Sequence, residues 1–107
     1  MNIEYTEPYK TSELLREEVK VALKEPSMYQ VVMHNDDFTP MEFVVAVLEL
    51  FFHMERAIAT KLMYDIHMTG KAICGIYSRD IAATKVDQVV EHARRHEYPL
   101  LCSIEAL

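Results

Sequence analysis

Three consecutive oxygen-bearing side chains, Asn35, Asp36 and Asp37, precede a long apolar segment in the first half of the chain. A lone histidine, His67, stands near the end of the next apolar repeat. Two carboxylates, an amide oxygen and a neutral imidazole together accept hydrogen bonds far more readily than they donate them. Such a set favours a small cation that carries several N–H groups, and an ammonium group meets that requirement.

Apolar side chains accompany this polar set at helical spacing. Met41 and Val44 share the first turn of one predicted helix, while Met63 lies one turn before His67 on the next. Because only a short segment separates the two helices, we expect an antiparallel hairpin that brings the start of the first beside the end of the second. The polar residues and Thr39 then border an apolar hollow, whose walls are Met41, Val44, Met63 and Ile66.

A free peptide N-terminus with a large hydrophobic first residue presents an ammonium group and an apolar side chain together. A charge-assisted hydrogen bond is worth about 1.5–3 kcal/mol, and burial of a Leu or Phe side chain contributes a similar amount. Neither contribution alone overcomes the cost of association, so recognition requires both. Simpler interpretations also exist, because aspartates cap helices, lone histidines are often structural and methionines fill cores. The spacing alone therefore leaves the function open.

The pattern around the polar set predicts a strand followed by a helix. Residues 28–33 are aromatic and β-branched and end just before the Asn-Asp-Asp turn. A T-x-x-E capping box starts at Thr39, with Pro40 at the first helical position. Phe38 and Phe43 have the spacing of a hydrophobic staple. A helix is therefore predicted from this box to about residue 52.

The remaining elements follow from periodicity and from one glycine. Residues 55–68 repeat apolar side chains every four positions, and Gly70 supplies a left-handed helix end. The rest of the pattern predicts a strand, a helix and a strand, over residues 71–77, 81–93 and 100–104. The predicted fold class is α+β, a small single domain of order β-α-α-β-α-β whose three-stranded antiparallel sheet packs on helices.

Composition narrows the function classes. The chain has 107 residues, with 11 basic and 17 acidic side chains and a net charge of −6. Scattered basic residues in a negative chain argue against nucleic-acid binding, and no apolar run approaches the ~20 residues that span a bilayer. Residues 1–25 are predicted to be a flexible N-terminal extension, and residues 26–107 the folded domain. Cys74 and Cys102 lack C-x-x-C spacing, which favours free thiols and a cytoplasmic location.

Enzymatic and metal-dependent functions find little support in the sequence. His67 and Asp37 resemble part of an acid–base pair, but no serine or cysteine stands in a nucleophile motif. His92 and His96 are four residues apart, as in zinc-binding helices, but the sequence places no third ligand. A solvated helix surface is the preferred interpretation, and neither a metal nor another cofactor is predicted.

Three blocks, in order along the chain, carry a resemblance to a known family. They are Asn35-Asp36-Asp37-Phe38-Thr39-Pro40-Met41-Glu42-Phe43-Val44, then His67 with Gly70-Lys71-Ala72-Ile73-Cys74-Gly75, then Pro99-Leu100-Leu101-Cys102. From about Ser27 to Glu105 the sequence resembles ClpS, the family of bacterial adaptors that deliver N-degron substrates to the ClpA–ClpP protease.

The resemblance implies a role for each matching position. It implies that Asn35, Asp37 and His67 hold the substrate α-amino group and that Asp36 contacts the peptide backbone just after it. Docking on the ClpA N-terminal domain is implied for Asp80 and Lys85. Met41 is implied to exclude β-branched first residues. The implied side-chain pocket consists of Met33, Thr39, Met41, Val44, Met63, Ile66 and Leu100.

The function implied is that of an adaptor and not of an enzyme. It would bind substrates whose first residue is Phe, Tyr, Trp or Leu and hand them to the ClpA unfoldase for degradation by ClpP, thereby modulating the substrate choice of that protease. The unfoldase would pull on the N-terminal extension during handover, and the adaptor is expected to be a monomer. The alternative is a scaffold that docks on a AAA+ unfoldase without binding peptide N-termini.

Overall fold

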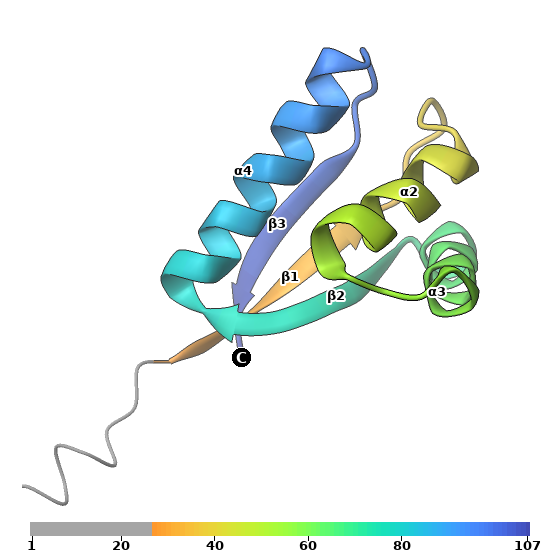
Figure 1. The fold of residues 1–107 in the computed structure, drawn as a ribbon. Coiled ribbons are helices and arrows are strands. Elements are labelled where there is room, and N and C mark those ends of the chain that lie inside the picture. The colour runs from red at the N-terminus through yellow and green to blue at the C-terminus, as the bar shows by residue number, and fades with distance from the viewer. Residues whose placement is uncertain (1–26) are drawn as a thin grey trace, which may run out of the picture.

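A computed structural model of the protein describes residues 27–107 (Figure 1). The predicted N-terminal extension, residues 1–25, lies outside the described residues. The element order β-α-α-β-α-β confirms the prediction. The elements are β1 (Met28–His34), α2 (Met41–Phe52), α3 (Arg56–Thr69), β2 (Lys71–Ser78), α4 (Arg79–Arg95) and β3 (Leu101–Ala106).

β1 is the central strand of a three-stranded antiparallel sheet of order β2-β1-β3 (Figure 1). Its apolar run suits this position, since Val31, Val32 and Met33 are all buried. The register pairs His34, the last residue of β1, with Lys71 of β2 and Leu101 of β3. All three strands therefore meet at the end of β1, where the polar segment begins.

The helices pack against the face of the sheet that carries Val31 and Met33. Leu48 of α2, Met63 of α3 and Val89 of α4 join these two residues in one hydrophobic core. Rigid packing of this kind fixes the helix ends that approach the end of β1. None of the helices within residues 27–107 is both long and apolar enough to cross a membrane.

A β-bulge interrupts the pairing of β1 with β2. The register shifts between Val31 and Val32, which leaves Cys74 of β2 as the extra residue. Cys74 and Cys102 are free thiols, as predicted, and both are buried. Burial raises the pKa of each thiol to about 12, and the neighbouring Cys102 adds to the effect at Cys74. Both side chains therefore remain protonated and inert at neutral pH.

The predicted capping box at the start of α2 is wrong. Pro40 occupies the N-cap position, and no side chain caps the helix. The backbone N–H groups of Phe43 and Val44 donate to the Pro40 carbonyl at 3.0 and 3.2 Å. The Thr39 hydroxyl donates instead to the Asp36 carboxylate. The side chain predicted to cap the helix therefore stabilises the loop before it.

The predicted hydrophobic staple is also wrong. Phe38 is 77% exposed, so it buries too little surface to act as a staple. Phe43 packs instead on residues from the C-terminal part of the chain, and its ring centroid lies 4.8 Å from that of Tyr98. Long-range packing has overridden the local pattern.

Helices α2 and α3 do not form the predicted antiparallel hairpin. Figure 1 shows α2 from the side and α3 nearly end-on, so the two helices cross. His53, directly after α2, has a left-handed backbone with φ 56°, which redirects the chain before α3 begins. α3 ends as predicted, at Gly70 with φ 97°, whose N–H donates to the Ile66 carbonyl at 2.9 Å.

Candidate functional site

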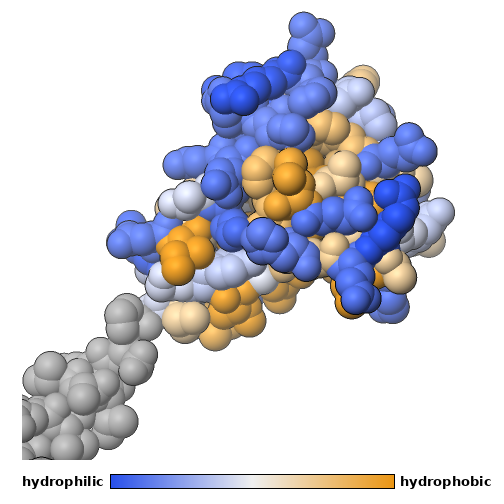
Figure 2. All heavy atoms as spheres, in the orientation of Figure 1, coloured by the Kyte–Doolittle hydropathy of each residue, from blue (hydrophilic) through white to orange (hydrophobic). Residues whose placement is uncertain are grey.

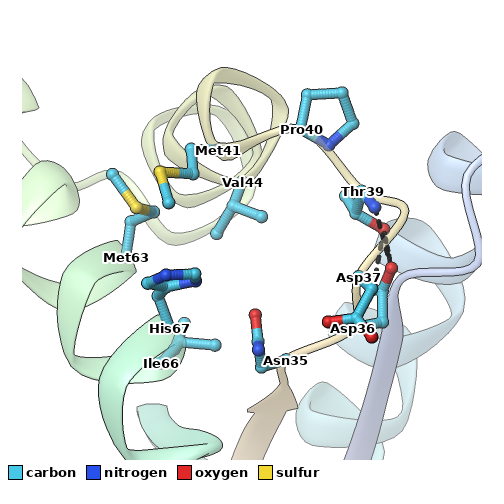
Figure 3. A pocket seen from close by; sticks show the side chains of 10 residues that line it. All are labelled: Asn35, Asp36, Asp37, Thr39, Pro40, Met41, Val44, Met63, Ile66 and His67. Carbon is cyan, nitrogen blue, oxygen red and sulfur yellow. Dashed lines mark hydrogen bonds between the residues drawn. The ribbon is translucent and has the colours of Figure 1, made fainter.

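A pocket of about 280 Å³ opens beyond the end of β1, between the start of α2 and the end of α3 (Figure 3). It contains every residue of the polar rim and apolar hollow that spacing predicts. Pro40 also lines it, and its place between two predicted members, Thr39 and Met41, was the signal that could have found it. The lining residues are Asn35, Asp36, Asp37, Thr39, Pro40, Met41, Val44, Met63, Ile66 and His67.

Strand pairing assembles the two sides of the pocket. His34 of β1 pairs with Lys71 of β2, and the next residue, Asn35, donates its backbone N–H to the Gly70 carbonyl at 2.8 Å. Gly70 directly follows α3, whose last turn carries His67. The histidine is therefore held beside the Asn-Asp-Asp segment by the β1–β2 ladder, although the helices that frame the pocket cross.

The carboxylate of Asp36 organises the loop that leads into α2. Its Oδ1 atom accepts the backbone N–H groups of Phe38 and Thr39 at 2.9 and 2.8 Å. The Thr39 hydroxyl donates to the same carboxylate, at 2.7 Å from Oδ2 (Figure 3). Most of the hydrogen bonds that the Asp36 carboxylate can accept thus come from its own loop, which fixes the shape of this part of the pocket rim.

The other polar groups of the rim remain open to a ligand. Asn35, Asp37 and His67 are exposed, and Figure 3 shows the Asn35 and His67 side chains directed toward the space between α3 and the loop. Among the hydrogen bonds and ion pairs within residues 27–107, none engages the Asn35 amide, the Asp37 carboxylate or the His67 ring. These acceptors can therefore converge on one donor-rich group.

Apolar side chains form the inner part of the pocket. Val44, Met63 and Ile66 are buried, whereas Met41 is 40% exposed and stands at the mouth. Met41 and Met63 lie side by side opposite the polar loop (Figure 3). Because methionine side chains are unbranched and adaptable, this wall can adjust to a flat aromatic or an aliphatic group.

Met33 and Leu100 do not line the pocket that the structure forms. Met33 is 0% exposed and Leu100 is 4% exposed, and both belong to the hydrophobic core. Met33 lies one residue before His34, on the face of β1 that the helices cover. The resemblance implies a pocket role for both residues, and this role stays a prediction. They belong to the same hydrophobic core as the lining residues Val44, Met63 and Ile66.

The pocket rim is electronegative. Its lining includes two aspartates, and none of the lining residues is lysine or arginine. Lys71, which is adjacent in the ladder, is drawn toward Glu105, with 3.9 Å between the ammonium and carboxylate atoms. The rim therefore attracts a cation and repels an anion.

The two predicted docking residues lie on α4, away from the pocket lining. Asp80 is exposed in the first turn of this helix. Lys85 donates from Nζ to the Phe51 carbonyl at the end of α2, at 2.7 Å, and lies 5.8 Å from the centre of the Tyr77 ring. Lys85 therefore links α4 to the end of α2.

The part of the chain that the structure describes contains no group of three or more His, Cys, Asp or Glu side chains placed to hold a metal ion. Its two thiols are buried and protonated. The pocket offers hydrogen-bond acceptors and apolar surface, which suit binding.

Comparisons with known proteins agree with this geometry. The family model for ClpS, the ATP-dependent Clp protease adaptor protein, matches residues 24–103. A curated relative, the ATP-dependent Clp protease adapter protein ClpS of Shewanella piezotolerans, is 55% identical over 93 residues, covering 87% of this chain and 91% of the relative. A solved structure of Agrobacterium tumefaciens ClpS2 bound to L-phenylalaninamide is similar, with a TM-score of 0.76 and 34% identity, covering 78% of this chain and 100% of that chain.

Proposed function

Because the chain belongs to the ClpS family of ATP-dependent Clp protease adaptor proteins, we propose that its pocket binds the free α-amino group and bulky hydrophobic side chain of N-degron substrates. The first residues accepted are Phe, Tyr, Trp and Leu. The observation that carries this proposal is the meeting of unengaged acceptors and an apolar wall in one pocket. The Agrobacterium relative supports it, since L-phenylalaninamide combines a free amine with a benzyl group.

Each part of the pocket has a separate task in this mechanism. The α-ammonium group donates its three N–H bonds to the Asn35 amide oxygen, the Asp37 carboxylate and a neutral His67 ring. Asp36 holds the loop in shape and contacts the peptide backbone after the first residue. The apolar side chain enters between Met41 and Met63 and reaches Val44 and Ile66, which exclude water from it.

Met41 is well placed to select among side chains. It stands half-exposed at the mouth, where a side chain branched at Cβ would meet it first. Phe, Tyr, Trp and Leu have an unbranched CH₂ group at Cβ and branch only at Cγ, so their side chains pass Met41. This geometry supports the exclusion of Val and Ile.

Delivery completes the proposed function. The adaptor docks on the N-terminal domain of ClpA through Asp80 and Lys85, and the unfoldase engages the N-terminal extension and takes over the substrate for ClpP. Deletion of residues 1–20 should then leave peptide affinity unchanged but abolish accelerated degradation in a reconstituted ClpA–ClpP assay. Retained acceleration would refute this role of the extension.

Fluorescence anisotropy tests the binding step directly. Peptides that begin with free Phe or Leu should bind, and copies acetylated at the N-terminus should not, because acetylation removes the charge and two donors. A peptide that begins with Ser controls for the side-chain requirement and should bind only weakly. Equal binding of the free and acetylated peptides would favour the alternative, a scaffold that docks on an unfoldase without reading peptide N-termini.

A further inference from the structure

Two imidazole rings lie together at the C-terminal end of α4, outside the peptide pocket. His92 and His96 are one helical turn apart, and their ring centroids are 4.7 Å apart with planes inclined by 55°. His92 is half-buried and His96 is exposed. They form the single pair of histidines at this spacing among the five in the chain.

The surrounding side chains fix the first ring of this pair. His92 stacks on Phe43 of α2, with centroids 5.3 Å apart and planes 13° from parallel, and meets the edge of Phe51 at 5.3 Å. Figure 2 shows apolar side chains gathered between α4 and α2 and hydrophilic ones around them. A ring held in this way loses little freedom when it binds a ligand.

A hydrogen bond orients the second ring. His96 Nδ1 lies 2.9 Å from the main-chain oxygen of His92. A carbonyl oxygen only accepts hydrogen bonds, so Nδ1 carries the hydrogen and Nε2 keeps its lone pair. Histidines that bind metals usually donate their second ring N–H to a carbonyl or carboxylate in this manner.

The distance between the rings suits a shared metal ion. Imidazole nitrogens bind zinc at about 2.0–2.1 Å, which places the ion roughly 3.2 Å from each ring centre. Two rings that meet such an ion at angles between 90° and the tetrahedral value then have centres roughly 4.5–5.2 Å apart. The observed 4.7 Å lies within this range.

Two arginines near the histidine pair are held by one carboxylate. Arg94 and Arg95 are drawn to Glu91, at 3.9 and 3.3 Å. Their charges are thus partly compensated beside the pair.

We propose that His92 and His96 chelate one divalent transition-metal ion of the Zn²⁺, Ni²⁺ and Cu²⁺ class, each through one ring nitrogen. Imidazole is a good ligand for these ions, and Cu²⁺ should bind most tightly. Since no third protein ligand stands nearby within residues 27–107, water completes the coordination shell. The bound ion would fasten the last turn of α4, whose first ring packs on α2.

Calorimetric titration of the full, tag-free chain with NiCl₂ tests the site. One ion should bind per chain, and CuCl₂ should bind more tightly. His92→Phe keeps an aromatic ring against Phe43 but removes the ligand nitrogen, and His96→Asn removes the other. Each should weaken binding at least about tenfold. His53→Asn, which removes an exposed histidine at the end of α2, is the matched control and should leave the titration unchanged.

Three results would overturn the proposal: no saturable binding, unchanged binding in His92→Phe or His96→Asn, or an equal loss in His53→Asn. Circular dichroism of each variant distinguishes a lost ligand from a lost fold. The metal site does not rest on peptide recognition, since none of its residues lines the pocket. Anisotropy with a Phe-initiated peptide should therefore give the same affinity in both histidine variants.

Discussion

Two adjacent aspartates at the pocket rim have different hydrogen-bonding environments. The Asp36 carboxylate accepts two backbone N–H groups and the Thr39 hydroxyl, whereas the exposed Asp37 carboxylate has no hydrogen-bond or ion-pair partner within residues 27–107. Residue type and spacing alone do not distinguish them. The difference arises from the direction of the loop, which turns one carboxylate onto the backbone and leaves the other exposed.

Asp37→Ala should therefore weaken binding of a Phe-initiated peptide by about 1–3 kcal/mol, because the substrate ammonium loses its charged partner. Anisotropy titration measures this loss. Asp87→Ala, an exposed aspartate on α4 outside the pocket lining, removes the same charge and should change the affinity little. Equal losses in both variants would mean that Asp37 acts only through net charge.

Met41→Ala should widen the mouth of the pocket and admit peptides that begin with Val or Ile. The structural reason is its half-exposed position at the entrance, in front of the buried apolar residues. Met68→Ala is a suitable control, since this methionine is 78% exposed on α3 and does not line the pocket. The ratio of Val to Phe affinities should rise in the first variant only. An unchanged ratio in Met41→Ala would refute a selective role.

At the scale of the elements, the sequence predicts their order and type but not how all of them meet. Periodicity and Gly70 locate the strands and helices because these signals are local. The hairpin prediction fails because the crossing of α2 and α3 depends on the backbone at His53 and on packing against the sheet. The rim and the hollow still come together, because antiparallel pairing of His34 with Lys71 fixes His67 beside Asn35.

Local patterns mislead where distant residues compete for the same groups. The Thr39 hydroxyl fits a capping box, yet it donates its hydrogen bond to the Asp36 carboxylate. Phe43 fits a staple, yet Tyr98, which is far along the chain, provides its packing partner. Sequence spacing carries no information about such competition.

The end of α3 offers a test of the link between backbone geometry and stability. Gly70 has φ 97°, and a Cβ atom there would meet nothing within 4 Å. Gly70→Ala should therefore destabilise the protein through backbone strain alone, by about 1–2 kcal/mol. Gly70→Asn, which tolerates the left-handed region better, should cost less. Urea denaturation measures both, and an equal cost for the two would point to a cause other than backbone strain.

At the scale of the whole molecule, the stability should depend on pH through His92. Burial lowers the pKa of His92 from its ordinary value of 6.5, with smaller contributions from His96 and Arg95. The unfolded chain therefore binds the proton more tightly than the folded one, and stability falls as pH drops below about 6.5. Above this value the ring is neutral in both states, and its contribution is constant.

Chemical denaturation at a series of pH values should show this decline, and His92→Phe should make it shallower because it removes the titrating ring but keeps its packing. His53→Asn, at an exposed histidine, provides the control and should reproduce the original profile. A profile in His92→Phe that matches the parent protein would assign the decline to other groups.

The hydrogen bond from the Asn35 backbone N–H to the Gly70 carbonyl joins the pocket to the paired strands β1 and β2. The pocket therefore depends on this pairing, since local unfolding that separates β1 from β2 also separates the Asn-Asp-Asp segment from His67. Under the proposed function, partial thermal unfolding of this strand pair would therefore release a bound substrate before its delivery to the protease.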